Sequence, residues 1–244
     1  MRAHSFLGNI TIGNSRQGYN RRGPQVDRNE IKRQAAIAAL DYVKDGITLG
    51  VGSGTTVHQF IAALPQVRGR ISAVVASSQD TRSRLESGGF EVSDLADTGD
   101  IDLYVDGADE ANKHFQLIKG GGGALTREKV LAAASRRFVC IIDDSKLVGS
   151  LGAFPVAVEV IPMARSYVAR QFIRARGQPI LRQGFVTDNG NQILDIHNLT
   201  IPNPPEMESW FSQLAGVVTV GIFANRPADV LIVADGKEVR RSER

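Results

Sequence analysis

Cysteine and long hydrophobic runs are the features that the sequence most clearly lacks. Cys140 is the only cysteine among 244 residues, so a single chain cannot contain a disulfide, and one thiol cannot complete a zinc site. It lies within the apolar stretch RRFVCII, where it is expected to pack as a small hydrophobic residue. No apolar run approaches the ~20 residues that a membrane-spanning helix needs. A disulfide-stabilised fold is excluded, membrane association is not expected, and a reducing cytoplasm is the expected compartment.

The sequence also lacks a large excess of charge of one sign. The formal net charge is only +3, and much of it comes from residues 1–28, which contain five arginines and one aspartate. The remainder of the chain is close to neutral, so the basic pI does not indicate a nucleic-acid partner. Residues 1–28 also lack the apolar core of a secretory signal. We expect this segment to be a basic leader outside the fold, either a disordered arm or an added extension.

Hydrophobic periodicity predicts strands that alternate with short helices over residues 29–153. Strands are expected at ITLGV, ISAVVA, FEVSDL, IDLYV and RFVCII, and helices at EIKRQAAIAALDYV, TVHQFIAAL, DTRSRLES and ALTREKVLAAA. This alternation is typical of an α/β fold in which helices cover both faces of a mostly parallel sheet.

Residues 154–227 follow a different rhythm. FPVAVEVI is a predicted strand and MARSYVARQFIRARG a helix; two strands then flank Asn189-Gly190, a strong hairpin signal. The helix PPEMESWFSQLA and the strand GVVTVGIF complete the order β-α-β-β-α-β of a ferredoxin-like unit. The last segment, ADVLIVADGKEVRR, is expected as one strand and a tail returning to the first sheet. The prediction is a Rossmann-like domain of residues 29–153 and 228–244, with a ferredoxin-like α+β domain (154–227) inserted.

The stretch GVGSGTT places hydroxyl groups where a strand ends and a helix begins. Free backbone N–H groups there, together with Ser53, Thr55 and Thr56, would suit a phosphate group. A plain strand-to-helix turn explains the same residues. A dinucleotide fingerprint needs G-x-G-x-x-G, whereas the spacing here is G-x-G-x-G, and the Gly-Lys-Ser/Thr of a nucleotide P-loop is missing. The motif alone leaves phosphate binding and a plain turn open.

The stretch DGADE brings two carboxylates to the C-terminal end of a predicted strand. Asp106 and Asp109 follow IDLYV, at the edge where open α/β sheets bind ligands. Two close, partly buried carboxylates differ in pKa and divide acid and base work. An Asp-Gly turn with helix capping is the purely structural alternative. A metal site is disfavoured and no metal is expected, because no histidine or third carboxylate is suitably spaced.

The stretch KGGGGALTREK joins a lysine, four glycines and a predicted helix. Four successive glycines cost conformational entropy, which favours a loop whose backbone comes close to a small ligand. Lys119 would supply positive charge where an oxyanion develops. Glu128 would point back toward the loop from the first turns of the helix, although a helix N-terminus favours negative charge for electrostatic reasons alone. Each residue fits an ordinary loop or helix by itself, whereas their clustering favours a site.

Lys146 in DDSK follows another strand, so it is expected at the same edge of the sheet as Asp106 and Ser53. Three strand ends thus bring hydroxyl, carboxylate and ammonium groups to one rim. This combination predicts a site for a small phosphorylated molecule.

Seven stretches together resemble ribose-5-phosphate isomerase of type A. They are GVGSGTT, YVDGADE, IKGGGGALTREK, DDSK, VEVIPMAR, RQGFVTDNGN and GVVTVGIFANRPADV, in the family's order and spacing, over about residues 29 to 244. The resemblance implies a Rossmann-like domain with a ferredoxin-like domain inserted before the last strand. It also implies interconversion of ribose 5-phosphate and ribulose 5-phosphate in the non-oxidative pentose phosphate pathway, without metal or organic cofactor. The implied partners are the phosphosugar and further copies of the chain, as a homodimer or homotetramer.

The resemblance further implies roles for individual residues. Glu128 matches the catalytic base, which moves a proton between C1 and C2 through a cis-enediolate. Asp106 resembles the residue that shuttles the hydroxyl proton and helps to open the furanose ring, and Asp109 resembles its partner. Lys119 matches the lysine that stabilises the enediolate oxygen. The other implied substrate contacts are Ser53, Gly54, Thr55, Thr56, Gly107, Ala108, Gly120, Gly121, Gly122, Lys146 and, from local alignment of its helix, Lys32.

Three other functions fit the sequence less well. A sugar-responsive transcription regulator would need a DNA-binding domain, and residues 1–28 are too few and lack helical periodicity. A sugar-phosphate deaminase would need its own base for ring opening, usually on a histidine loop, which we do not find. A nucleotide-dependent dehydrogenase is disfavoured by the missing third glycine. An isomerase is therefore favoured over a binding module.

Overall fold

The computed structural model describes residues 27–244, so the predicted basic leader lies outside the described residues except for its last two. Those two begin the first helix, α1 (Arg28–Ala39). The Asp27 side chain caps this helix by accepting a hydrogen bond from the Asn29 backbone N–H at 3.1 Å. The first helix therefore begins one residue before the predicted start of the domain at residue 29.

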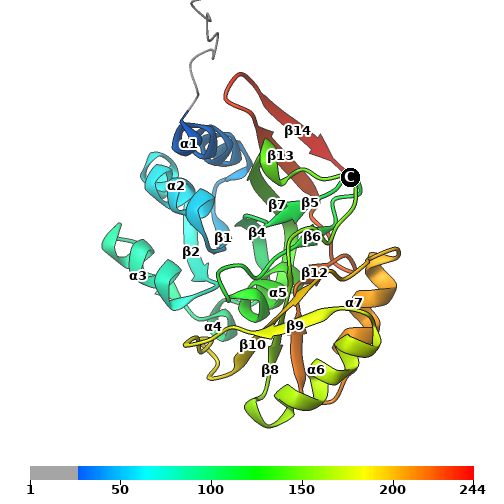
Figure 1. Ribbon diagram of the computed structural model, residues 1–244. Coiled ribbons are helices and arrows are strands. Elements are labelled where there is room, and N and C mark those ends of the chain that lie inside the picture. Colours follow the sequence, from blue (N-terminus) through cyan, green and yellow to red (C-terminus); the bar gives the residue numbers. More distant parts are fainter. Residues whose placement is uncertain (1–26) are drawn as a thin grey trace, which may run out of the picture.

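A seven-stranded sheet forms the larger layer of the molecule (Figure 1). Its strand order is β14-β13-β7-β4-β1-β2-β3, and all neighbours are parallel except β13 and β14. The strands are β1 (Ile47–Val51), β2 (Ile71–Ala76), β3 (Val92–Ser93), β4 (Ile101–Asp106), β7 (Ser135–Asp143), β13 (Val230–Ala234) and β14 (Val239–Glu243). The central strands are buried on both faces, which explains their continuous apolar sequences.

Helices cover both faces of this sheet, as predicted. On β7, Val139 and Ile141 join a core with α1 and α2 (Thr55–Ala63), whereas Phe138 and Cys140 face α5 (Leu125–Ala134). Cys140 is fully buried, and burial raises the pKa of its thiol to about 12. The shorter helices are α3 (Gln79–Ser87), α4 (Leu95–Thr98) and the 3₁₀ turns Leu40–Tyr42, Leu64–Arg70, Asp144–Lys146 and Pro162–Ala164.

The inserted ferredoxin-like domain has the predicted order of elements. These are β8 (Val156–Val160), α6 (Arg165–Arg174), β9 (Gln178–Leu181), β10 (Gln192–His197), α7 (Pro204–Ser212) and β11 (Val217–Val220). The strands form an antiparallel sheet in the order β11-β8-β10-β9. The two helices pack together through Phe172 and Phe211, whose ring centroids lie 4.2 Å apart. The exact domain boundaries stay a prediction.

The helix α5 lies between the seven-stranded sheet and the sheet of the inserted domain, and its position fixes where Glu128 lies (Figure 1). Leu131 and Ala132 pack on the large sheet. Leu125 packs against Ala157 and Ile193 of the inserted domain. Both domains therefore hold the helix that carries Glu128.

Three features differ from the sequence prediction. A small sheet of β12 (Ile222–Phe223), β6 (Leu117–Ile118) and β5 (Glu110–Ala111) was not predicted, because two-residue strands have no readable period. The expected C-terminal tail is β14, an exposed and polar edge strand. The Asn189-Gly190 turn exists, but the β9–β10 ladder ends at the Leu181–Leu194 pair, well before the turn. Among residues 27–244, no helix is long and apolar enough to cross a membrane.

Candidate active site

A cavity of about 230 Å³ lies at the C-terminal ends of β1, β4 and β7, beside the first turn of α5. It brings together every predicted site residue except Asp106. The lining residues are Arg28, Lys32, Ser53, Gly54, Thr55, Thr56, Gly107, Ala108, Asp109, Lys119, Gly120, Gly121, Gly122, Glu128, Asp143, Ser145 and Lys146.

Glu128 is a carboxylate at one end of this cavity, although only 3% of it is exposed. Ser53 Oγ donates a hydrogen bond to Glu128 Oε1 at 2.5 Å, and Lys119 Nζ lies 3.2 Å from Oε2. Burial, and then the negative charge of Asp106, raise the pKa of Glu128 to about 7; Lys119 and Ser53 act in the opposite direction. A carboxyl group with this pKa exchanges protons near neutral pH, as a general base requires.

Asp106 lies directly behind the cavity and is fully buried. Its Oδ1 accepts hydrogen bonds from the backbone N–H groups of Ser53 (3.0 Å) and Gly107 (2.7 Å). Its Oδ2 accepts a hydrogen bond from the Tyr104 hydroxyl and lies 2.8 Å from Lys119 Nζ. Both oxygens thus accept from protein donors, and one of them holds Lys119; direct contact of Asp106 with a substrate stays a prediction.

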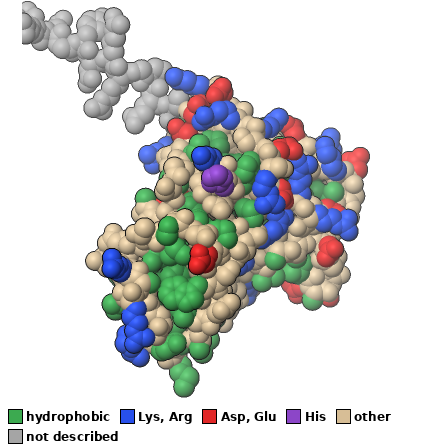
Figure 2. All heavy atoms as spheres, turned by 90° about the vertical axis from the view of Figure 1, so that its right-hand side faces the viewer, with side chains coloured by type: hydrophobic (Ala, Val, Ile, Leu, Met, Phe, Trp, Pro, Cys, Tyr) green, Lys and Arg blue, Asp and Glu red, His purple; other side chains and the backbone are tan. Residues whose placement is uncertain are grey.

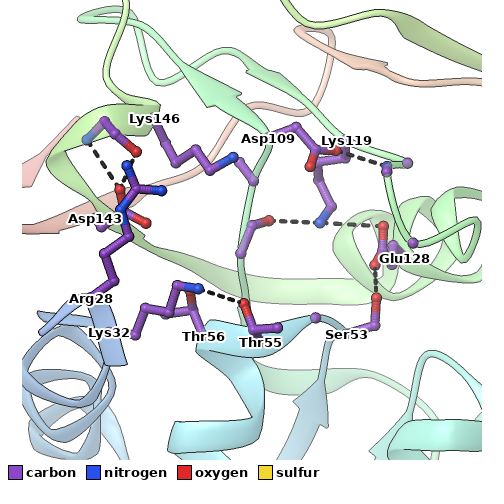
Figure 3. A pocket seen from close by; sticks show the side chains of 17 residues that line it. Arg28, Lys32, Ser53, Thr55, Thr56, Asp109, Lys119, Glu128, Asp143 and Lys146 are labelled. Atoms are coloured by element: carbon purple, nitrogen blue, oxygen red, sulfur yellow. Dashed lines mark hydrogen bonds and ion pairs between the residues drawn. The ribbon is translucent and has the colours of Figure 1, made fainter. Parts of the chain in front are cut away.

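Lys119 is a buried ammonium group between the carboxylates of Asp106 and Glu128, and Figure 3 shows its contact with Glu128. Burial alone would lower its pKa, but the charges of Asp106 and Glu128 outweigh burial and raise the pKa of Lys119 above its usual value. Lys119 Nζ also donates a hydrogen bond to Gly107 O at 2.7 Å. The cavity therefore contains a fixed positive charge beside the carboxylate of Glu128 at neutral pH.

The glycine run forms another wall, and its composition has a packing reason. Gly120 (φ +116°) and Gly123 (φ +82°) adopt backbone conformations that other residues rarely adopt. A Cβ on Gly120 would meet Ala157 Cβ at 2.6 Å, and one on Gly123 would meet the Phe185 ring at 2.2 Å. Contact with the inserted domain thus explains these two glycines without a ligand. Gly120 and Gly121 both line the cavity, and Gly121 donates its N–H to Asp109 Oδ2 at 2.8 Å.

Cationic groups gather at the other end of the cavity. Figure 3 shows Arg28, Lys32 and Lys146 there, away from Glu128 and Ser53. Lys32 Nζ donates a hydrogen bond to Thr55 Oγ1 at 2.9 Å, in the first turn of α2. A helix N-terminus with hydroxyl groups and nearby cations binds phosphate well. The two ends of the cavity therefore differ. The end with Arg28, Lys32 and Lys146 favours an anion, and the end with Glu128 has a group suited to proton transfer.

Three lining residues were not predicted from the sequence: Arg28, Asp143 and Ser145. Arg28 was assigned to the leader, although its spacing of four from Lys32 places both on one face of a helix. Asp143 accepts a hydrogen bond from the Ser145 N–H at 3.1 Å and caps the 3₁₀ turn that carries Lys146. No short motif signals such a cap as part of a site. In the described part of the chain, no His, Cys, Asp and Glu side chains are grouped so as to hold a metal ion.

Comparison with known proteins identifies the family. Residues 73–238 match the model of ribose 5-phosphate isomerase A (phosphoriboisomerase A). The structure resembles ribose 5-phosphate isomerase A from Neisseria gonorrhoeae, with 41% identity and a TM-score of 0.88 over 89% of this chain and 98% of that one. It also resembles the protein from Methanocaldococcus jannaschii, with 33% identity and a TM-score of 0.83 over 89% of this chain and 100% of that one.

A third similar structure is a D-ribose-5-phosphate isomerase in complex with phospho-erythronic acid. It is 35% identical, with a TM-score of 0.84, over 88% of this chain and 98% of that one. The family model covers more than half of the chain, and these structures agree in fold over nearly their whole length. The chain therefore belongs to the ribose 5-phosphate isomerase A family.

Proposed function

We propose that the protein interconverts D-ribose 5-phosphate and D-ribulose 5-phosphate, with Glu128 as the base. The observation that carries the proposal is the position of Glu128: a buried carboxylate with a pKa of about 7, beside a buried lysine and opposite a cationic pocket end. A phosphosugar bound by its phosphate at the cationic end extends its carbonyl toward Glu128 and Lys119.

The phosphate binds at the end formed by Arg28, Lys32, Lys146 and the N-terminus of α2. The Thr55 and Thr56 hydroxyls and free N–H groups of the helix donate hydrogen bonds, and the three side chains supply positive charge. Binding energy from this remote group orients the reacting carbons.

At the other end, Glu128 removes the proton from the carbon next to the carbonyl and returns it to the neighbouring carbon, through a cis-enediolate. Such a proton is weakly acidic, so its removal needs stabilisation of the oxyanion that forms. Lys119 supplies that stabilisation, and Asp106 fixes the lysine in place. Asp109, which lines the cavity, exchanges protons with substrate hydroxyl groups and assists furanose ring opening.

We also propose that the protein acts in the cytoplasm as a homodimer or homotetramer, without metal or organic cofactor. Exposed apolar side chains of the inserted domain support self-association. Hydrophobic side chains gather over the lower part of the molecule in Figure 2, where that domain lies. Among its exposed residues are Met163 (93% exposed), Tyr167, Ile173 and Trp210.

The direct test is to mix purified protein, ribose 5-phosphate and EDTA, and to follow ribulose 5-phosphate by absorbance or NMR. Isomerisation in EDTA is the expected result. Binding of ribose 5-phosphate by calorimetry without turnover would contradict the catalytic proposal and indicate a sugar-phosphate sensor. Absence of both binding and turnover would contradict the proposed substrate.

A further inference from the structure

We propose that Glu159, on β8 of the inserted domain, is a positioning residue that holds the first turn of α5 and thereby aims the Glu128 carboxylate. Glu159 does not line the cavity and acts only through other residues. The inference rests on the proposed role of Glu128 and extends it to the inserted domain.

Glu159 is a fully buried carboxylate whose hydrogen-bond donors are all uncharged. Its Oε2 accepts from Thr126 Oγ1 at 2.5 Å. Its Oε1 accepts from Thr187 Oγ1 (2.9 Å), Asn189 Nδ2 (3.1 Å) and Asn191 Nδ2 (2.8 Å). Within residues 27–244, no basic side chain forms an ion pair with it. Burial of an unpaired carboxylate is unfavourable, so simple packing does not account for glutamate here.

The contact reaches the catalytic helix close to Glu128. Thr126 lies in the first turn of α5, two residues before Glu128. The helix lacks a side-chain cap, because the N-cap position is Ala124. The Thr126–Glu159 hydrogen bond satisfies no free backbone N–H, but it attaches this uncapped first turn to β8.

A second connection passes through the turn formed by residues 187–191. Arg127, the residue just before Glu128, donates to Asn189 Oδ1 at 2.9 Å and to Asp188 O at 2.8 Å. Glu159 holds the same turn from inside through Thr187, Asn189 and Asn191. Both residues that precede Glu128 are thus attached to the inserted domain around one buried carboxylate.

Position matters here because Glu128 must reach a carbon-bound proton. Proton transfer needs near-contact geometry, and a misplacement of about 1 Å costs up to ~100-fold in rate. The phosphate end is formed by α1, α2 and the 3₁₀ turn Asp144–Lys146, none of which contains a hydrogen-bond partner of Glu159. Loss of Glu159 should therefore affect kcat more than KM.

The test variant is Glu159→Gln, in which an amide NH₂ donor replaces one of two acceptor oxygens that together face four donors. We expect kcat for ribose 5-phosphate to fall ~10- to 100-fold, with KM changed less than ~3-fold, per folded protein in EDTA buffer. Glu208→Gln is the matched control. Glu208 is also buried; it pairs with Lys129 of α5 and accepts from the Ala224 and Asn225 N–H groups at 2.7 Å, but does not touch the first turn. Its kcat should stay within ~3-fold of wild type.

Thr126→Val tests the same link if Glu159→Gln folds poorly, because it removes only the hydroxyl that reaches Glu159. The double variant Thr126→Val/Glu159→Gln should lose less activity than the product of the two single losses. Equal losses in Glu159→Gln and Glu208→Gln, or a kcat within ~2-fold of wild type in both Glu159→Gln and Thr126→Val, would overturn the proposal.

A readout without turnover separates this proposal from the proposed function. The ¹³C resonance of the Glu128 carboxyl, assigned by its loss in Glu128→Gln, should titrate near pH 7 in the wild type. In Glu159→Gln the helix start loosens and water reaches the carboxyl, so its pKa should fall toward the ordinary value. If the pKa of Glu128 falls in Glu159→Gln but the wild type has no isomerase activity, the proposed reaction alone would be refuted. An unchanged titration with normal wild-type turnover would refute the positioning role alone.

Discussion

The two ends of the cavity are built on different physical principles. At the base end, Glu128, Lys119 and Asp106 are all buried and hold one another through short polar contacts. At the phosphate end, Arg28 is exposed and Lys32 and Lys146 are half-buried. Charges in a water-excluded environment interact strongly and stay fixed, whereas exposed charges are screened and mobile. The difference implies that substitutions at the base end reduce kcat, and those at the phosphate end raise KM.

The largest effect should come from Glu128→Gln. Removal of a general base costs ~10²- to 10⁴-fold in kcat, and we expect the upper end because Glu128 is the cavity-lining carboxylate that is paired with Lys119. Ribose 5-phosphate affinity, measured by calorimetry, should stay within ~3-fold, because the phosphate end is unchanged. Strong residual turnover would show that another group is the base.

Lys119→Met should have the next largest effect. The substitution removes the charge that stabilises the developing oxyanion, and we expect kcat to fall ~10²- to 10³-fold. It also leaves Asp106 and Glu128 without their shared cation, so the pKa of Glu128 should rise further and the acidic limb of the pH–rate profile should move upward. Steady-state kinetics across pH test both effects. A normal kcat with a raised KM would place Lys119 in binding instead.

Glu128 should also make stability depend on pH. Its folded pKa of about 7 lies above the ordinary value of 4.5, so the folded state retains a proton that the unfolded state has lost between these values. Stability from this group is complete below about pH 4.5 and is lost as pH rises through about 7. The free energy of unfolding of Glu128→Gln minus that of wild type should therefore be larger at about pH 8 than at about pH 4.5, by up to ~3 kcal/mol. Urea unfolding at both pH values measures this difference. An equal difference at both pH values would contradict the raised pKa.

The smallest effects should come from the phosphate end. Arg28→Ala and Lys146→Ala should each raise KM about 2- to 5-fold with little change in kcat, because cations that remain accessible to solvent contribute about 1 kcal/mol or less each. The increase of KM in both variants should become smaller at high salt, because salt screens these charges. Arg33→Ala is a suitable control, because Arg33 lies on the same helix but pairs with Glu30 and does not line the cavity. A loss of kcat in Arg28→Ala without a change in KM would contradict the division between the two ends.

The sequence predicted the parts of the fold that have strong periods or strand-end motifs. The buried strands of both sheets and the inserted β-α-β-β-α-β order follow from apolar runs. The gathering of Ser53, Asp109 and Lys146 follows from the rule that parallel strands end at one edge. The fully buried position of Asp106 was not predictable, because its partners Ser53 and Lys119 come from other segments of the chain.

Long-range polar contacts account for most of what was missed. Glu159 lies in the apolar stretch FPVAVEVI and its partners are more than 25 residues away in the chain, so no local pattern relates it to Glu128. Arg28 was missed because the composition of the leader obscured the helical spacing to Lys32. The run of four glycines was interpreted as bringing the backbone close to a ligand, and Gly120 to Gly122 line the cavity. The packing of Ala157 and Phe185 of the inserted domain against Gly120 and Gly123 was not predicted.

The most direct test of the contrast between the two ends is the pH dependence of kcat/KM in the presence of EDTA. Glu128 must be ionised to accept a proton, so kcat/KM should rise with pH through an apparent pKa of about 7 and then level off. This limb lies about one unit above the second pKa of a phosphate monoester, near 6. An acidic limb near 7 that disappears from the residual rate of Glu128→Gln would support Glu128 as the buried base. A profile that is flat between about pH 5 and 8, or the same limb in Glu128→Gln, would contradict it.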